Sequence, residues 1–174
     1  MEEKFYLDED RVSVFIGKHG KEKLNFEKKF NCKLDINSKN GEVIIKAENS
    51  IDIFILSNII SAINYGHSPE NALKLEDESN VLDVIDIKTI IKDHNRLKTV
   101  MGRIIGKEGT TRKTIEQITK CSISVKDHFV SAIGAYENII VVHEALLMLI
   151  SGSSHKSFYS YLERNKVGSE AGIL

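Results

Sequence analysis

The chain has 174 residues, of which 41% are hydrophobic and 28% charged, and its formal net charge is −1. This composition is typical of a globular protein and leaves room for one medium domain or two small ones. Two cysteines are too few for a disulfide scaffold. The most apolar stretches, 51–63 and 139–150, are shorter than the roughly 18 residues that a membrane span needs. Because the N-terminal residues do not resemble a signal peptide, we expect a cytoplasmic protein.

The first part of the chain, residues 1–68, predicts the element order β-α-α-β-β-α. Gly17 is a helix-ending signal, Asn40-Gly41 is a hairpin turn signal, and Ser50 is the expected N-cap of a long helix. Hydrophobic alternation on either side of the hairpin turn predicts two strands. The expected elements are a strand at 4–7, helices at 11–16 and 21–30, strands at 33–37 and 42–47, and a helix at 51–65.

The same order returns over residues 81–152. Residues 69–80 begin at the single proline and are polar and acidic, so we expect a linker with at most one helical turn. The expected elements are then a strand at 81–87, helices at 97–105 and 110–120, strands at 122–125 and 129–133, and a helix at 136–150. Residues 88–96 have no counterpart in the first copy and are interpreted as an insertion. In the extension 153–174 we expect a helix at 156–165 and a disordered end.

A glycine motif marks the repeat most clearly. Ile16-Gly17-Lys18-His19-Gly20 recurs 89 positions later as Ile105-Gly106-Lys107-Glu108-Gly109. At the same shift, Glu27 falls on Glu116 and Cys32 on Cys121; after the hairpin turn the shift drops to 85. A length change confined to a surface turn indicates that a whole domain was duplicated. The matched cysteines are expected to be small buried residues.

Positive charge gathers around both glycine loops although the formal net charge of the chain is −1. Residues 16–33 carry a net charge of +4 and residues 96–126 carry +6, whereas residues 70–95 carry −4. Such local positive fields are the expected footprint of a nucleic-acid backbone.

The loop chemistry suits a phosphodiester. Two glycines that flank two residues permit a sharp turn and a close approach of the backbone, and the helix that follows presents its positive end. Single-stranded RNA is the expected ligand, with Ile104, Ile105, Ile123 and Val125 as an apolar wall for its bases. The candidate RNA-binding residues are Gly17, Lys18, His19, Gly20 and Lys21, and Arg103, Gly106, Lys107, Glu108, Gly109, Arg112 and Lys113. We expect Glu108 to face solvent, because its carboxylate would repel a phosphate.

The segment Gly102-Arg103-Ile104-Ile105-Gly106-Lys107-Glu108-Gly109 resembles the signature of a K-homology (KH) domain. Two such modules, the acidic joint and the tail after Ile150 are similar to archaeal tandem-KH proteins, which are related to the eukaryotic partner-of-Nob protein of small-subunit ribosome assembly. The resemblance implies an α+β fold of two tandem type I KH domains, at 1–68 and 81–152. In the eukaryotic relatives the first module resembles a KH domain without its glycine loop. Here Gly17 and Gly20 are both present, so it stays open whether both modules bind RNA.

The resemblance also implies a function and partners. It implies binding near the 3′ end of the small-subunit ribosomal RNA and assistance in its maturation. It implies contact with a Nob-type endonuclease and with the alpha subunit of archaeal initiation factor two.

Other classes of protein fit the sequence less well. No enzyme, metal or cofactor is expected, because the six histidines lack metal-ligand spacing, neither cysteine has partners for nucleophilic catalysis, and no Walker loop occurs. An RNA-degradation, exosome-associated or general RNA-binding KH protein remains an alternative. A protein-interaction scaffold that no longer binds RNA is another. The modest net charge favours the scaffold, whereas the intact glycine pairs and positive windows disfavour it.

Overall fold

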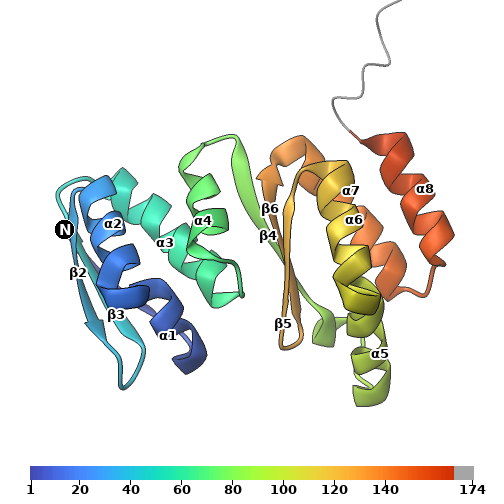
Figure 1. Ribbon diagram of the computed structural model, residues 1–174, viewed down its shortest axis with the longest axis horizontal. Coiled ribbons are helices and arrows are strands. Elements are labelled where there is room, and N and C mark those ends of the chain that lie inside the picture. The colour runs from blue at the N-terminus through green and yellow to red at the C-terminus, as the bar shows by residue number, and fades with distance from the viewer. Residues whose placement is uncertain (167–174) are drawn as a thin grey trace, which may run out of the picture. The chain divides into compact units, whose positions relative to one another are not determined.

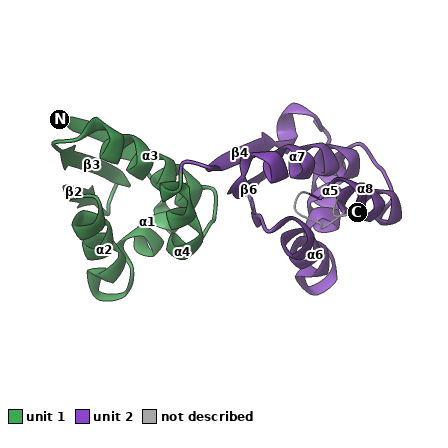
Figure 2. Cartoon of the chain, turned by 90° about the horizontal axis from the view of Figure 1, so that it is seen from above, with its two compact units in different colours: residues 1–77 green, residues 78–174 purple. Residues whose placement is uncertain are grey.

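The computed structural model describes residues 1–166 and divides the chain into two compact units, 1–77 and the residues from Glu78 onward (Figures 1 and 2). The disordered end expected of the extension falls on residues 167–174, which lie outside the described residues. Among residues 1–166, no helix is long and apolar enough to cross a membrane.

The first unit is a three-stranded antiparallel sheet with helices on one side (Figure 1). Its strands lie in the order β1-β3-β2, and β2 and β3 form the hairpin predicted around Asn40-Gly41. Phe15, Phe26 and Leu56 are fully buried between helices and sheet. The elements are β1 Glu2–Tyr6, α1 Glu9–Ile16, the 3-10 turn η1 Lys18–Gly20, α2 Lys21–Lys29, β2 Cys32–Asn37, β3 Glu42–Ala47, α3 Ser50–Asn64, α4 Pro69–Ala72 and the 3-10 turn η2 Leu73–Glu76.

The second unit repeats this arrangement with a sheet in the order β4-β6-β5. An additional C-terminal helix, α8, packs against α6 and α7, and its Phe158 and Leu162 are fully buried. The elements are β4 Asn80–Asp86, the 3-10 turn η3 Ile87–Thr89, α5 His94–Ile105, the 3-10 turn η4 Lys107–Gly109, α6 Thr110–Thr119, β5 Ser122–Lys126, β6 Phe129–Ala135, α7 Tyr136–Ile150 and α8 His155–Asn165.

A paired glutamate ties helix to sheet in both units. The Glu27 carboxylate accepts a hydrogen bond from the Leu34 amide at 2.8 Å, and the Glu116 carboxylate accepts one from the Ile123 amide at 2.9 Å. The two glutamates were matched by the sequence repeat, and the structure gives them the same partner position. The alignment of the two halves therefore reflects a shared three-dimensional arrangement.

The matched cysteines differ in burial. Cys121 is 2% exposed, in agreement with the prediction, whereas Cys32 is half-buried. Burial, with a smaller contribution from the Glu27 and Asp52 carboxylates, raises the pKa of the Cys32 thiol to about 11.

The acidic segment 69–80 is not a linker over most of its length. Ser68 caps α4 by accepting a hydrogen bond from the Asn71 amide at 3.2 Å, and Ala72 and Leu75 are 0% and 7% exposed. These two apolar side chains pack on the first unit, and the acidic neighbours hid them in the sequence pattern. Residues 77–79 are all that separates η2 from β4.

Two helix starts also differ from the prediction. The N-cap of α3 is Asn49, whose side chain accepts from the Ile51 amide at 2.9 Å, and Ser50 is the first helical residue. Helix α5 begins at His94, earlier than expected, because Asp93 caps it by accepting from the Arg96 amide at 2.8 Å. Part of the predicted insertion therefore lengthens this helix, which has 12 residues against 8 in α1.

Candidate nucleic-acid interface

The two glycine loops have the same backbone conformation. Gly17 has φ 75° and ψ 171°, and Gly106 has φ 76° and ψ 168°. The third residue of each loop, His19 or Glu108, lies in the left-handed region with φ 55° or 56°. Gly20 and Gly109, at φ 75° and 74°, are the N-caps of α2 and α6. Agreement to within a few degrees shows that both loops are complete and similarly shaped.

The two glycines of a loop have different surroundings. A Cβ on Gly106 would lie 2.6 Å from the backbone nitrogen of Thr111, and one on Gly17 would lie 2.9 Å from that of Glu22. A Cβ on Gly20 would meet nothing within 4 Å, and one on Gly109 would meet only the Lys113 Cε at 3.9 Å. The first glycine therefore serves packing, while the second leaves the backbone open to a ligand.

The loop side chains face outward. Lys18 and His19 are exposed, and so are Lys107 and Glu108, as expected for Glu108. Neither α2 nor α6 has a side-chain hydrogen bond at its N-cap; Glu22 lies in the first turn of α2, and α6 has no acidic residue in its first turn. Lys21 and Lys113 are exposed and Arg112 is half-buried. Within residues 1–166 these three and the two loop lysines form no ion pair, so their charge is available to a phosphate.

Arg103 has a structural role instead. Its guanidinium donates to the carbonyl oxygen of Leu149 at 3.0 Å and to that of Ser153, so it holds the C-terminal end of α7. The first unit has a similar brace, in which Arg11 donates to the carbonyls of Ile63 at 2.7 Å and His67 at 2.8 Å. Arg103, predicted as an RNA contact, is therefore occupied within the fold.

The predicted apolar wall is only partly at the surface. Ile104 and Ile123 belong to the core, at 0% and 3% exposed. Ile105 is 38% exposed, and Val125 is half-buried. Two of the four predicted wall residues therefore belong to the core, and Ile105, directly before the loop, is the most exposed of the four.

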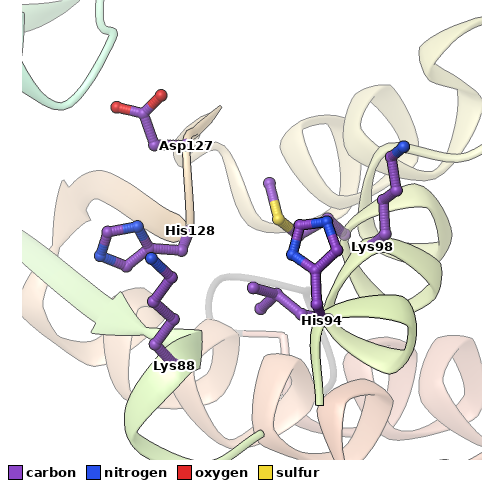
Figure 3. Close-up of a pocket in the computed structure, with 7 residues that line it drawn as sticks. Lys88, His94, Lys98, Asp127 and His128 are labelled. Atoms are coloured by element: carbon purple, nitrogen blue, oxygen red, sulfur yellow. The ribbon is translucent and has the colours of Figure 1, made fainter. Parts of the chain in front are cut away.

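A pocket of about 320 Å³ lies between α5 and the β5–β6 turn (Figure 3). Its lining surface is mostly apolar, and Leu97 and Met101 are the apolar residues among the charged and histidine side chains that line it. Sequence reasoning missed this site, because its residues come from three separate segments. The lining residues are Lys88, His94, Leu97, Lys98, Met101, Asp127 and His128.

No metal site accompanies these features within residues 1–166. In the part of the chain that the structure describes, no group of three or more His, Cys, Asp or Glu side chains is arranged to hold a metal ion. His128 Nε2 lies 3.6 Å from Asp86 Oδ1, and His143 Nδ1 lies 2.7 Å from Asp83 Oδ2, so each histidine pairs with one carboxylate of β4.

Comparison with known proteins agrees with this architecture. A family model for the second KH domain of PNO1 proteins, a eukaryotic-type KH domain (KH-domain type I), matches residues 81–167. A KH domain-containing protein of Methanocaldococcus jannaschii is 38% identical over 164 residues, which cover 92% of this chain and 72% of that protein. The RNA-binding protein pno1 of Dictyostelium discoideum is 36% identical over 110 residues, 61% of this chain and 45% of the relative. This chain therefore spans less than half of that eukaryotic protein.

A solved structure gives the same result in three dimensions. The Dim2p chain in a complex of a/eIF2alpha, aDim2p and rRNA from Pyrococcus horikoshii OT3 matches with a TM-score of 0.87 at 38% identity, over 94% of this chain and 93% of that one. An α+β fold with a KH domain is thereby confirmed, and so is the predicted resemblance. The chain belongs to the archaeal PNO1/Dim2 family of KH-domain proteins.

Proposed function

We propose that this chain is a single-stranded RNA-binding protein that acts in small-subunit ribosome assembly by holding ribosomal RNA near its 3′ end. The observation that carries the proposal is the Gly106–Gly109 loop, with an open second glycine and with Lys107, Arg112 and Lys113 free of ion pairs among the described residues. Relatives named as RNA-binding and pre-rRNA-processing proteins support it, and so does the rRNA in the similar complex. No catalytic step is part of this proposal.

The first unit is proposed to be a second KH domain, so that the chain holds two in tandem. Its support is the shared element order, the shared strand order, the matching loop dihedrals and the matching Glu27 hydrogen bond. The boundaries we propose are residues 1–77 and 78–152, with α8 as the ordered part of the C-terminal extension.

The second unit is proposed to bind RNA more strongly, because the helix before its loop carries the favourable charge. Its first turns carry His94, Arg96 and Lys98, whereas α1 opens with Glu9 and Asp10. The acidic residues of the helix before the first loop repel the phosphates that the lysines of that loop attract.

The partners proposed are ribosomal RNA and the alpha subunit of archaeal initiation factor two, since a similar chain was solved in complex with both. A Nob-type endonuclease is proposed as a third partner on the strength of the family resemblance.

The test compares loop variants in an RNA-binding titration. Lys107→Asp with Glu108→Asp should weaken binding of a short single-stranded RNA by at least about tenfold, which corresponds to about 1.4 kcal/mol. The matched change in the first loop, Lys18→Asp with His19→Asp, should cause a smaller loss. Asp tolerates the left-handed backbone at positions 19 and 108, so the fold should persist.

The control is Lys156→Asp, which makes an equivalent charge reversal on the exposed side of α8 and should leave affinity close to wild type. Binding should also weaken steeply as salt is raised, because phosphate contacts release counterions. Unchanged affinity in the Lys107/Glu108 variant would refute the loop assignment, and salt-independent binding would favour the protein-interaction scaffold.

A further inference from the structure

We infer that the C-terminal extension positions the Gly106–Gly109 loop for RNA, and that His155 is the positioning residue. The inference rests on the proposed RNA binding, to which it adds a role for α8. Its basis is a pair of hydrogen bonds that join the last turn of α5, directly before the loop, to the first residues of the extension. His155 acts through the backbone of α5 and does not itself touch the RNA.

The carbonyl groups at the end of α5 determine where the loop begins. The Gly106 amide donates to the carbonyl of Gly102 at 2.8 Å, which closes the helix. The next carbonyl, that of Arg103, lies 3.1 Å from His155 Nε2. Carbonyls in the last turn of a helix have no partner within that helix, and a histidine side chain can supply one. His155 therefore holds the turn that sets the position of Gly106.

This bond is one half of a reciprocal contact. While the backbone carbonyl of Arg103 accepts from His155, the Arg103 guanidinium donates to the carbonyl of Ser153. Because a carbonyl can only accept, His155 Nε2 carries the proton in this contact. Phe158 and Leu162 are fully buried and fix α8 on the second unit. The half-buried imidazole of His155 is thus presented to α5 by a rigid element.

The first unit follows the same chain path at this point but has no histidine there. At a shift of 86 residues the end of α3 matches the end of α7, and Gly66 and Gly152 have φ 101° and 103°. A serine then caps the following helix in both units. At the position of His155 the first unit has Pro69, whose side chain contains no hydrogen-bond donor. The contact to the end of the preceding helix is therefore specific to the second unit.

The arginine brace is also nearer to the loop in the second unit. Arg11 lies six residues before Gly17, whereas Arg103 lies three residues before Gly106. The difference is close to one helical turn. Both contacts tie the second loop more closely than the first to the segment after the last helix of its KH-like fold. A loop that is already held in place loses less conformational freedom when RNA binds, so it binds more tightly.

The test separates the hydrogen bond of His155 from the bulk of its ring. His155→Leu keeps a side chain of moderate size without a donor, whereas His155→Gln places an amide N–H near the position of Nε2. The full chain is titrated with single-stranded RNA that has the 3′-terminal sequence of the small-subunit ribosomal RNA. His155→Leu should weaken binding about three- to tenfold, the amount expected of one hydrogen bond, and His155→Gln should restore most of it.

The RNA-free protein gives an independent readout. The backbone amide NMR signals of residues 106–111 should move in His155→Leu and return toward the wild-type positions in His155→Gln. The signals of residues 17–20, in the first loop, should stay in place and serve as the reference.

The matched control weakens the same helix without touching α5. Ser154→Ala removes the hydrogen bond from the Ser157 amide to Ser154 Oγ, 3.1 Å long, which caps α8. Because the buried side chains of α8 remain, this variant should keep the loop signals and the RNA affinity close to wild type.

Combination with the loop variants locates the effect. His155→Leu should add its full loss to that of Lys18→Asp with His19→Asp, because the second loop is intact in that variant. It should add almost nothing to the loss of Lys107→Asp with Glu108→Asp, whose second loop no longer holds RNA.

Each failure has a distinct meaning. Unchanged affinity in His155→Leu, or unmoved signals at 106–111, would overturn the inference and leave the loop proposal standing. An equal loss in Ser154→Ala or in His155→Gln would also overturn it, since the stability of α8 or the shape of the ring would then explain the effect. A wild-type chain that does not bind this RNA would overturn the proposed function, and the inference with it.

Discussion

The two glycines of the second loop should respond very differently to the same substitution. Gly106→Ala and Gly109→Ala each add one methyl group within the same four-residue loop. At Gly106 the new Cβ would meet the Thr111 nitrogen at 2.6 Å, and that backbone atom cannot rotate away. At Gly109 the nearest atom is the flexible end of Lys113, at 3.9 Å. The structure therefore predicts a large loss of stability for the first change and a small one for the second.

The magnitudes follow from the dihedrals and the contacts. Gly106 at φ 76° and ψ 168° lies in a region that is essentially restricted to glycine, which costs an alanine about 1–3 kcal/mol. The overlap with Thr111 adds about 1–3 kcal/mol. We therefore expect about 3 kcal/mol or more for Gly106→Ala. Gly109, at φ 74° and ψ 16°, lies in the left-handed helical region and should cost about 1 kcal/mol.

Native-state hydrogen exchange followed by mass spectrometry measures this difference unit by unit. Amides of β6 that exchange through unfolding of the second unit should exchange roughly a hundredfold faster in Gly106→Ala and about fivefold faster in Gly109→Ala. Amides of β3 in the first unit serve as the internal reference. The reasoning is refuted if the two variants destabilise the second unit equally. Gly109→Ala should nevertheless weaken RNA binding, because its methyl group occupies the open approach to the backbone.

Three further predictions concern other contacts. Glu116→Ala should destabilise the second unit by about 1–3 kcal/mol, because it leaves the Ile123 amide without its acceptor, whereas Glu116→Gln should retain most of the stability; denaturant titration compares them. The Cys32 thiol should alkylate slowly until the pH approaches 11, which alkylation rates across pH can check. Because the neutral thiol is favoured in the folded state, its contribution to the free energy of unfolding should be fully present below the unfolded pKa near 9.0 and lost as the pH rises through 11, which denaturant unfolding across pH can check. Arg103→Ala should speed amide exchange across α8 more than Arg103→Lys does, because Arg103 donates hydrogen bonds to the carbonyls of Leu149 in α7 and of Ser153 just before α8. An equal effect of both substitutions would argue that these hydrogen bonds do not hold this segment in place.

The glycine loops could be predicted because their signal is local. Residues such as Gly17 and Gly106 are required by dihedrals that other residues rarely adopt, so the motif and its geometry appear together. The hairpin at Asn40-Gly41 is of the same kind. The N-cap of α3 was missed by one position because Asn49 and Ser50 are both good caps, and only the three-dimensional path decides which side chain reaches a free amide.

The linker prediction for residues 69–80 failed because composition was averaged over a window. The acidic residues of 69–80 outweighed Ala72 and Leu75, although two buried side chains suffice to fix a short helix on a domain. The pocket was missed for a different reason, since Lys88, Met101 and His128 are distant in sequence and meet only in the fold. A sequence signal did exist, because helical spacing places His94 and Lys98, followed by Met101 and Ile105, on one face of α5 that ends at the glycine loop.

Arg103 shows why the sign of a charged window does not identify the residues that bind RNA. The carbonyl oxygens at the end of a long helix need donors, and the equivalent ends of α3 and α7 obtain them from Arg11 and Arg103. Both helix ends therefore need a hydrogen-bond donor, but the arginine that supplies it stands at a different position of the preceding helix in each unit. A basic residue close to a GXXG loop therefore has two competing uses, and its hydrogen bonds decide between them. By that criterion Lys107 and Lys113 have their whole charge free among the described residues, whereas two N–H groups of Arg103 are already used within the fold.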